Sequence, residues 1–486
     1  MSSKTTAHDY IDLRLHIDGE WRDGKGRASE EVLNPANEQV LGLLPHASKQ
    51  DLDDVLDASA RGFETWRHTP IQDRAQVLFK ASALLDERQE TFSRLMTLEQ
   101  GKPLSEARGE VAFSSALLEF FAGEATRQYG TITPSRVSGG RNYLLRQPIG
   151  PSLALSPWNF PIITPMRKVG AALAAGCSCI LKPSEETPGS AVAMMQLFID
   201  AGLPPGVLQL VFGVPADVSS HLMASPIIRK ISFTGSIPVG KHLGALAAQT
   251  VKATTLELGG HSPVLVFDDA DLDKAISISA AAKFRNAGQV CIAPTRFYVH
   301  EKVHDAFVKG LIGFAENLNL GDGLDAATTM GPMANERRLQ AMEGFVQDAQ
   351  KVGASLRCGG KRVGNRGYFY APTVLDEIPD EARIMQEEPF GPIASVQRFD
   401  DMDEMLGRAN SLEFALAGYA FTESARTVSR LMEELQTGMI GINHCALTQP
   451  ELPFGGIKES GIGVESGAQG VEAYTVTKLI NHLVDG

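Results

Sequence analysis

Short apolar segments alternate with longer helical segments from residue 149 onward, and this alternation restricts the chain to an α/β architecture. Extended segments are predicted at 152–155, 178–181, 207–212 and 229–233, and a second alternation runs from about 262 to 443. The predicted intervening helices lie at 166–175, at 189–201 and from about Pro238. Parallel strands need such crossovers, so we expect two doubly wound α/β domains with the active site between them.

The part of the chain before residue 149 follows a different pattern. Strand-like pieces with turn signals occupy 15–44, and a helical period runs from Ser48 to about Arg127. Helix starts are predicted at Ser48 and Thr69-Pro70, with a break at 101–103. Residues 141–145 are predicted to form an extended arm.

Composition argues against several classes of protein. A net charge of −13 without a basic stripe argues against a nucleic-acid partner. No apolar stretch approaches the ~18 residues of a membrane span, and the first sixteen residues lack the apolar core of a signal peptide. The five cysteines are too few, and odd in number, for a disulfide framework, so we expect a cytoplasmic protein. Cys177-x-Cys179 has no second pair, which predicts buried apolar side chains and no metal site.

Two segments predict contacts with a phosphate-bearing cofactor. The turn 233–240 follows an apolar strand and opens a helix, which places Gly235 and Ser236 where a helix N-terminus stabilises a pyrophosphate. Lys182-Pro183-Ser184-Glu185 follows another strand, and an acidic residue there can accept both hydroxyls of an adenosine ribose. Each segment taken alone also fits an ordinary turn or a solvated loop.

Three further segments predict nucleophilic chemistry. Cys291 ends the polar run 286–291, where a thiolate is able to attack a carbonyl carbon. Glu257 precedes two glycines and is a candidate base. Asn159, between two prolines in 157–161, is a candidate oxyanion donor. Taken alone, Cys291 also fits a buried structural cysteine, and Glu257 also fits a solvated glutamate.

Taken together, the motifs closely resemble the aldehyde dehydrogenase superfamily over nearly the whole chain. The seven matching motifs are PWNFP at 157–161, KPSE at 182–185, FTGS at 233–236, ELGG at 257–260, GQVC at 288–291, EEPFGP at 387–392 and PFGGIKESG at 453–461. The resemblance implies an α/β fold in three parts. These are a Rossmann-like cofactor domain (1–127 and 149–256), an α/β catalytic domain (257–445) and a small β bridging element (128–148 and 472–486) that pairs chains into homodimers or homotetramers.

The resemblance also implies a mechanism. Cys291 would attack the aldehyde, Asn159 and the Cys291 backbone N–H would hold the oxyanion, and Glu257 would act as base; Lys168 matches a further catalytic position. The aldehyde would become a thiohemiacetal and then a thioester, which water hydrolyses to the carboxylate. NAD is the implied cofactor, with NADP possible. The implied cofactor-binding residues are Trp158, Lys182, Ser184, Glu185, Gly235, Ser236, Leu258, Glu388 and Phe390.

Within the superfamily, the chain is most similar to succinate-semialdehyde and α-ketoglutarate-semialdehyde dehydrogenases. Arg167 and Arg285 match arginines that bind a distal carboxylate, whereas Thr448 and Gln449 replace a serine pair often found near the substrate. A semialdehyde substrate is therefore expected, and an aromatic or aliphatic aldehyde without a carboxylate is the alternative. Glu257 argues against an enzyme that transfers the acyl group to coenzyme A, and the intact Cys291, Glu257 and Asn159 argue against a structural, crystallin-like protein.

Overall fold

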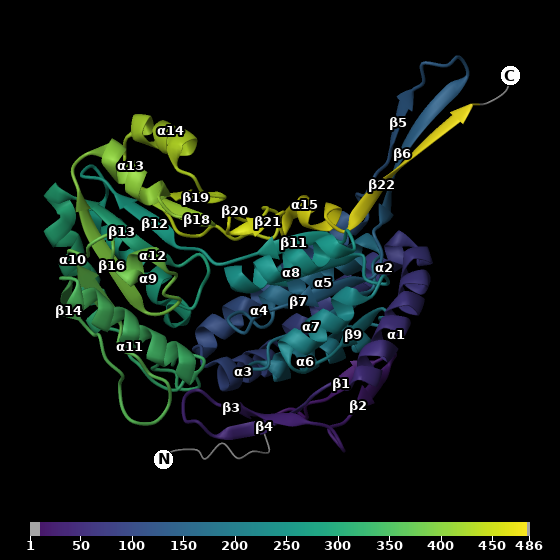
Figure 1. Ribbon diagram of the computed structural model, residues 1–486, viewed down its shortest axis with the longest axis horizontal. Coiled ribbons are helices and arrows are strands. Elements are labelled where there is room, and N and C mark those ends of the chain that lie inside the picture. The colour runs from purple at the N-terminus through teal and green to yellow at the C-terminus, as the bar shows by residue number, and fades with distance from the viewer. Residues whose placement is uncertain (1–9, 484–486) are drawn as a thin grey trace.

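The computed structural model describes residues 10–483. The first nine residues of the predicted cofactor domain and the last three of the predicted bridging element lie outside this range. Within it, two α/β lobes lie side by side, and a narrow sheet projects away from them (Figure 1). In residues 10–483, no helix is both long and apolar enough to cross a membrane.

The first lobe contains an eight-stranded sheet in the order β2-β1-β9-β8-β7-β10-β11-β21. The five strands from β9 to β11 are parallel, as predicted, whereas β1, β2 and β21 pair antiparallel at the edges. Its strands are β1 (Leu15–Ile17), β2 (Glu20–Arg22), β7 (Ser152–Leu155), β8 (Cys179–Lys182), β9 (Leu208–Leu210), β10 (Lys230–Thr234), β11 (Ala253–Glu257) and β21 (Gly461–Ile462). Cys177 and Cys179 are buried at the start of β8, as apolar residues would be.

Helices cover this sheet, and their caps explain where they begin and end. Ser48 caps the first helix through a reciprocal hydrogen-bond pair with Asp51, and α3 ends at Gly101, which adopts a left-handed conformation (φ 94°). The predicted break at 101–103 therefore separates two helices. The helices are α1 (Lys49–His68), α2 (Ile71–Glu87), α3 (Gln89–Gln100), α4 (Leu104–Ala125), α5 (Ile163–Ala175), α6 (Pro188–Asp200), α7 (Pro215–Ala224) and α8 (Ile237–Gln249).

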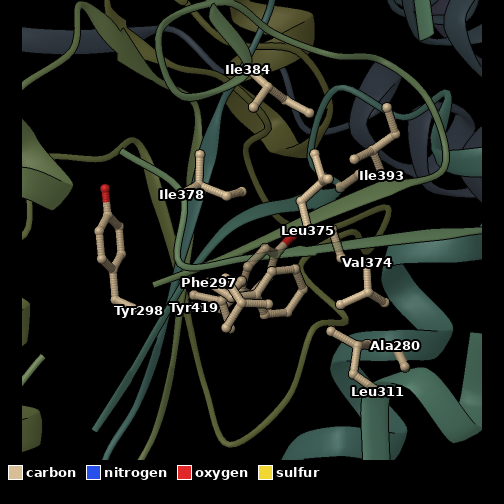
Figure 2. Packing of buried hydrophobic residues seen from close by; sticks show 14 of the residues in the cluster. Ala280, Phe297, Tyr298, Leu311, Val374, Leu375, Ile378, Ile384, Ile393 and Tyr419 are labelled. Atoms are coloured by element: carbon tan, nitrogen blue, oxygen red, sulfur yellow. The ribbon is translucent and has the colours of Figure 1, made fainter. Parts of the chain in front are cut away.

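The second lobe contains a seven-stranded sheet in the order β14-β15-β16-β13-β12-β18-β19, parallel except for β14. Apolar side chains from neighbouring strands and from α9 and α10 meet in its core, among them Phe297, Val374, Ala280 and Leu311 (Figure 2). Its strands are β12 (Ser262–Val266), β13 (Pro294–His300), β14 (Ser355–Cys358), β15 (Thr373–Asp376), β16 (Ile393–Phe399), β18 (Ala417–Phe421) and β19 (Met439–Ile442). Its helices are α9 (Leu272–Phe284), α10 (Glu301–Glu316), α11 (Glu336–Lys351), α12 (Arg383–Gln386), α13 (Met402–Asn410) and α14 (Ala425–Glu434).

The projecting sheet joins segments that are more than 300 residues apart in the chain. Strand β6 (Gly140–Pro148) lies between β5 (Thr131–Pro134) and β22 (Thr475–Leu483), and both neighbours are antiparallel to it (Figure 1). Large apolar side chains on this sheet are exposed, including Ile132 at 63% and Leu479 at 63%. The extended arm predicted at 141–145 is the middle of β6.

The segment after the second lobe returns to the first, an arrangement that the sequence pattern did not predict. Strand β21 pairs with β11, and α15 (Gly467–Glu472) packs on α4 and α5. Two small antiparallel pairs complete the described structure. They are β3 (Ser29–Leu33) with β4 (Val40–Pro45), and β17 (Phe414–Ala415) with β20 (Ile457–Lys458).

A close approach between α1 and the loop before β9 depends on Gly62. A Cβ atom on Gly62 would lie 2.0 Å from the carbonyl oxygen of Gly206, and this backbone has no flexible side chain that could move away. Gly62→Ala should therefore lower the free energy of unfolding by about 1–3 kcal/mol, measured as a lower melting temperature. Gly407→Ala in α13 is the matched control, because nothing lies within 4 Å of its Cβ position; an equal melting temperature for the two variants would contradict the prediction.

Candidate active site

A cavity of about 660 Å³ opens at the carboxyl ends of the parallel strands of the first lobe and faces the second lobe. The loop after β7, the turn after β10 and the end of β11 form one side of it, and the loop before β13 forms the other. Ligands bind at such strand ends in open α/β sheets. The cavity is lined by Glu106, Gly109, Glu110, Phe113, Pro157, Trp158, Asn159, Phe160, Ile163, Thr164, Arg167, Thr234, Gly235, Ser236, Glu257, Leu258, Gly259, Arg285, Val290, Cys291, Ile292, Arg338, Glu388, Phe390, Thr448 and Phe454.

Cys291 lies at the end of a constrained loop. The loop begins with the short turn Arg285–Gly288, in which Asn286 and Ala287 both have positive φ values. The Cys291 side chain is half-buried. Burial of the thiol and the negative charges of Glu257 and Glu388 hold its pKa well above the ordinary value, and Arg167 opposes this shift. Loss of the charge on Glu257 or Glu388 would therefore favour the thiolate.

Glu257 is the last residue of β11 and is 3% exposed. Burial raises the pKa of its carboxyl to about 7, and repulsion from Glu465 adds to the shift, while Lys168 and Arg167 oppose it. In the described chain its Oε1 atom has no hydrogen-bond partner. A carboxylate with a pKa near neutrality and a free oxygen suits a general base.

Asn159 lies in the loop after β7 and is buried. Its Nδ2 atom donates to the carbonyl oxygen of Gln289 (3.1 Å), in the loop that carries Cys291. The amide nitrogen of Asn159 therefore lies against the loop that ends at Cys291, which is compatible with its predicted role as an oxyanion donor.

Lys168 does not line the cavity. Its Nζ atom is fully buried and contacts Glu465 Oε1 and Thr234 Oγ1, each at 2.5 Å. Ser232 also donates to Glu465 Oε1 (2.9 Å), so this group of polar side chains lies beneath the sheet end that carries Glu257. Glu465, which raises the pKa of Glu257, was not predicted as a site residue. The only sequence signal for it is its position shortly after the PFGGIKESG motif.

The residues predicted for the nicotinamide end of a cofactor lie together. Glu388 accepts a hydrogen bond from the backbone N–H of Gly260 (3.1 Å), and burial raises its pKa to about 8. The rings of Trp158 and Phe390 meet edge to face at 5.5 Å. Arg338, which was not predicted, donates to the carbonyl oxygens of Pro389 and Phe390 and holds this loop.

The residues predicted for the phosphate and adenosine end divide into two groups. Gly235, Ser236 and Leu258 line the cavity, and no side chain caps the N-terminus of α8, which begins after Ser236. Free backbone N–H groups at such a helix start suit a pyrophosphate, so the residues fit a dinucleotide. Lys182, Ser184 and Glu185 lie outside the cavity lining, at the end of β8, where Lys182 and Glu185 form an ion pair. The hydroxyl of Ser184 donates to Glu186.

Two further arginines, Arg167 and Arg285, line the cavity. Arg167 is 6% exposed, and its guanidinium lies 4.0 Å from the centroid of the Phe454 ring and 5.9 Å from that of Phe113. Arg285 is exposed, with its guanidinium 5.4 Å from the ring of Phe160. No motif in the sequence indicated Phe113, and Phe454 was noted only as part of the PFGGIKESG motif.

The structure places Thr448 and Gln449, the residues that replace a serine pair, in different surroundings. Thr448 lines the cavity, whereas Gln449 does not.

The model of the aldehyde dehydrogenase family matches residues 21–480. The chain belongs to this family. This aldehyde dehydrogenase is 45% identical over 469 residues to a putative 4-(hydroxymethyl)benzenesulfonate dehydrogenase, TsaD2, of Comamonas testosteroni (96% of this chain, 98% of the relative). It is 42% identical to the NADP⁺ succinate-semialdehyde dehydrogenase GabD of Escherichia coli K12, over 96% of each chain. The crystal structure of a Burkholderia pseudomallei succinate-semialdehyde dehydrogenase superposes with a TM-score of 0.96 at 40% identity, covering 99% of this chain and all of that one. The enzyme is thus an NAD(P)-dependent aldehyde dehydrogenase with the fold of its family, as the motifs predicted.

The raised pKa of Glu257 predicts the pH dependence of turnover. A base must be unprotonated, so under conditions where hydrolysis of the thioester limits turnover, kcat should fall about tenfold per pH unit below pH 7 and level off above it. Glu257→Gln should lower kcat by roughly 10²–10⁴-fold and abolish that slope. Steady-state NADH production from pH 5.5 to 9 measures both, with the exposed Glu387→Gln as control. A slope below pH 7 that persists in Glu257→Gln would assign the titration to another group.

Proposed function

We propose that this enzyme oxidises an aldehyde whose far end carries an anionic group, most simply a semialdehyde with a distal carboxylate. The observation that carries the proposal is the buried guanidinium of Arg167 in the cavity. In residues 10–483 no carboxylate pairs with Arg167, and its Nε atom has no hydrogen-bond partner. A substrate anion would supply the missing partner.

The energetics of Arg167 favour such a ligand. A buried charge without a partner costs several kcal/mol, and stacking on Phe454 and Phe113 recovers only about 0.5–2 kcal/mol per ring. A planar guanidinium matches a carboxylate with two hydrogen bonds, and Arg285 adds a second positive charge at the same wall. The two guanidinium groups therefore support the proposal that the cavity binds an anion.

The relatives support a substrate with an anionic group, but they do not distinguish a carboxylate from a sulfonate. Those named above act on a semialdehyde, which carries a carboxylate, or on a benzenesulfonate, which carries a sulfonate. The two groups share a negative charge and oxygen acceptors, which an arginine binds in either case. Succinic semialdehyde remains our first candidate substrate, and an anionic aromatic aldehyde is the second.

The proposed chemistry uses three residues, Cys291, Asn159 and Glu257, and their presence around one cavity supports it. The Cys291 thiolate forms a C–S bond to the aldehyde carbon, and the oxyanion that results accepts hydrogen bonds from Asn159 Nδ2 and the Cys291 backbone N–H. NAD(P)⁺, when bound, supplies the hydride acceptor that converts this thiohemiacetal to a thioester. Glu257 then removes a proton from the water that displaces the Cys291 thiolate and releases the carboxylic acid.

We also propose that the projecting sheet, built from 128–148 and 472–483, is the bridging element by which chains associate as dimers or tetramers. Its exposed apolar side chains support this role, as do its outer strands β5 and β22, which have no second strand partner within residues 10–483. The same division assigns 149–256, with the segment before 128, to cofactor binding and 257–445 to catalysis.

Replacement of Arg167 tests the anion proposal. The methionine in Arg167→Met can still pack between the rings, but it cannot bind an anion. Loss of the Arg167 charge acts on the pKa of Cys291 and Glu257 with either aldehyde, so the ratio of the two substrates isolates the anion contact. The variant should lower kcat/KM for succinic semialdehyde relative to kcat/KM for butanal about 10- to 100-fold, equivalent to 1.5–3 kcal/mol. The same comparison uses 4-formylbenzenesulfonate against benzaldehyde, with the exposed Arg94→Met as control. Equal rates for charged and uncharged aldehydes in both proteins would point instead to an aromatic or aliphatic aldehyde without a carboxylate.

Glu185 provides a test of cofactor preference. We propose NAD as the preferred cofactor, because the Glu185 carboxylate would repel a 2′-phosphate. Glu185→Gln should raise kcat/KM for NADP⁺ relative to NAD⁺ about tenfold, equivalent to ~1.4 kcal/mol. Glu186→Gln is the matched control, since Glu186 is held by Ser184 and Arg337. A wild-type enzyme that already favours NADP⁺ would contradict the proposal.

A further inference from the structure

A buried ion pair lies behind the candidate oxyanion hole and takes no direct part in the chemistry. Lys102 and Glu110 are paired with side chains that are each 1% exposed. Lys102 follows α3, and Glu110 lies in α4, eight residues further along the chain. The Lys102 ammonium also lies 4.3 Å from the centroid of the Phe160 ring.

The Lys102 ammonium holds the Asn159 backbone. Its Nζ atom donates to the carbonyl oxygen of Asn159 at 2.8 Å. The same oxygen accepts a second hydrogen bond from Asn286 Nδ2 at 2.9 Å. With two donors on one oxygen, the peptide of Asn159 is fixed from both sides.

The Glu110 carboxylate holds the start of the helix that follows. Its Oε1 atom accepts from the backbone N–H groups of Ile162 (2.8 Å) and Ile163 (3.1 Å). Helix α5 has no side-chain cap of its own, so Glu110 satisfies its free donors from another element. The loop that carries Asn159 is therefore held at Asn159 by Lys102, which precedes α4, and at its junction with α5 by Glu110 of α4.

The nucleophile loop is tied to the same region through Asn286. Gln100 Nε2 donates to Asn286 Oδ1 (2.8 Å), and the Asn286 backbone N–H donates to Glu106 Oε2 (2.8 Å). These contacts support the positive φ of Asn286, five residues before Cys291. The short region 100–110 thus contacts both loops that supply the proposed oxyanion donors.

We propose that Lys102 and Glu110 are positioning residues that set the distance between the Asn159 amide and the Cys291 backbone N–H. The inference rests on the proposed function, since it takes these two groups as the oxyanion donors. A buried ion pair contributes little net stability, because desolvation offsets the attraction. Here its remaining hydrogen bonds all go to the Asn159 loop and the start of α5, whose placement catalysis needs to within about 0.5 Å.

The experiment measures acyl transfer without a cofactor or an aldehyde. The Cys291 thiolate attacks the carbonyl carbon of p-nitrophenyl acetate, p-nitrophenolate leaves, and an acetyl thioester forms on Cys291; this step needs the oxyanion hole. Alkylation of Cys291 by iodoacetamide uses the same thiolate and forms no oxyanion. Both rates are measured for wild type, Lys102→Met, Glu110→Gln, Asn159→Ala and the double variant Lys102→Met/Asn159→Ala.

We expect Lys102→Met to slow acylation about 10- to 100-fold and to leave alkylation within about threefold of wild type. Glu110→Gln, which keeps the size and one acceptor oxygen, should slow acylation less. In the Asn159→Ala background, Lys102→Met should have little further effect, because coupled residues are not additive. Lys252→Met is the matched control, since Lys252 is a buried lysine that donates to the carbonyl oxygens of Ser225 and Ile228, neither of which lines the cavity.

The alternative outcomes separate the inference from the proposed function. If Lys102→Met slows acylation and alkylation equally, or multiplies fully with Asn159→Ala, the pair has no specific role at the oxyanion hole. If Asn159→Ala itself leaves acylation unchanged, the oxyanion assignment fails instead, and the positioning role fails with it. If Lys102→Met does not fold, Glu110→Gln with and without Asn159→Ala decides the question by the same criteria.

Discussion

The rest of this structure depends on one constraint, which is that ionisable groups are buried at the carboxyl ends of the strands of the first sheet. Glu257, Glu388 and Cys291 lie around a single cavity, and burial is the largest cause of the raised pKa of each. Parallel strands that end at one edge bring such groups together, and the second lobe excludes water from them. The perturbed pKa values and the reactive geometry therefore have one origin, which is the meeting of two lobes over the strand ends.

Two buried ion pairs lie next to the candidate site residues. Lys168 with Glu465 lies below Glu257, and Lys102 with Glu110 lies behind Asn159. Neither lysine lines the cavity, yet each contacts residues or loops that do. Arg167 differs, because aromatic rings and no carboxylate surround its guanidinium in the described chain. This contrast separates two lysines with carboxylate partners from an arginine without one, and it supports the proposed role of Arg167 in binding a substrate anion.

Much of the fold was predictable because its signals are local. Strand β7 lies at 152–155 as predicted, and the Ser48 cap and the break at Gly101 follow from side chains within a few residues. The return of β21 to β11 was not predictable, since it depends on contacts between segments about 200 residues apart. The same limit applies to the site: the motifs indicated Cys291, Glu257 and Asn159, but Phe113, Arg338 and Glu465 reach it only through tertiary packing.

The projecting sheet and the cavity are joined by more than sequence order. Residue 474, just before β22, packs in the first lobe: its carbonyl accepts from the backbone N–H of Ile149, and its ring lies 4.7 Å from the Lys230 ammonium. Lys230 is in β10, whose end supplies Thr234 to the cavity and to Lys168. Buried groups therefore connect the start of the projecting sheet to the strand that contributes Thr234 to the cavity.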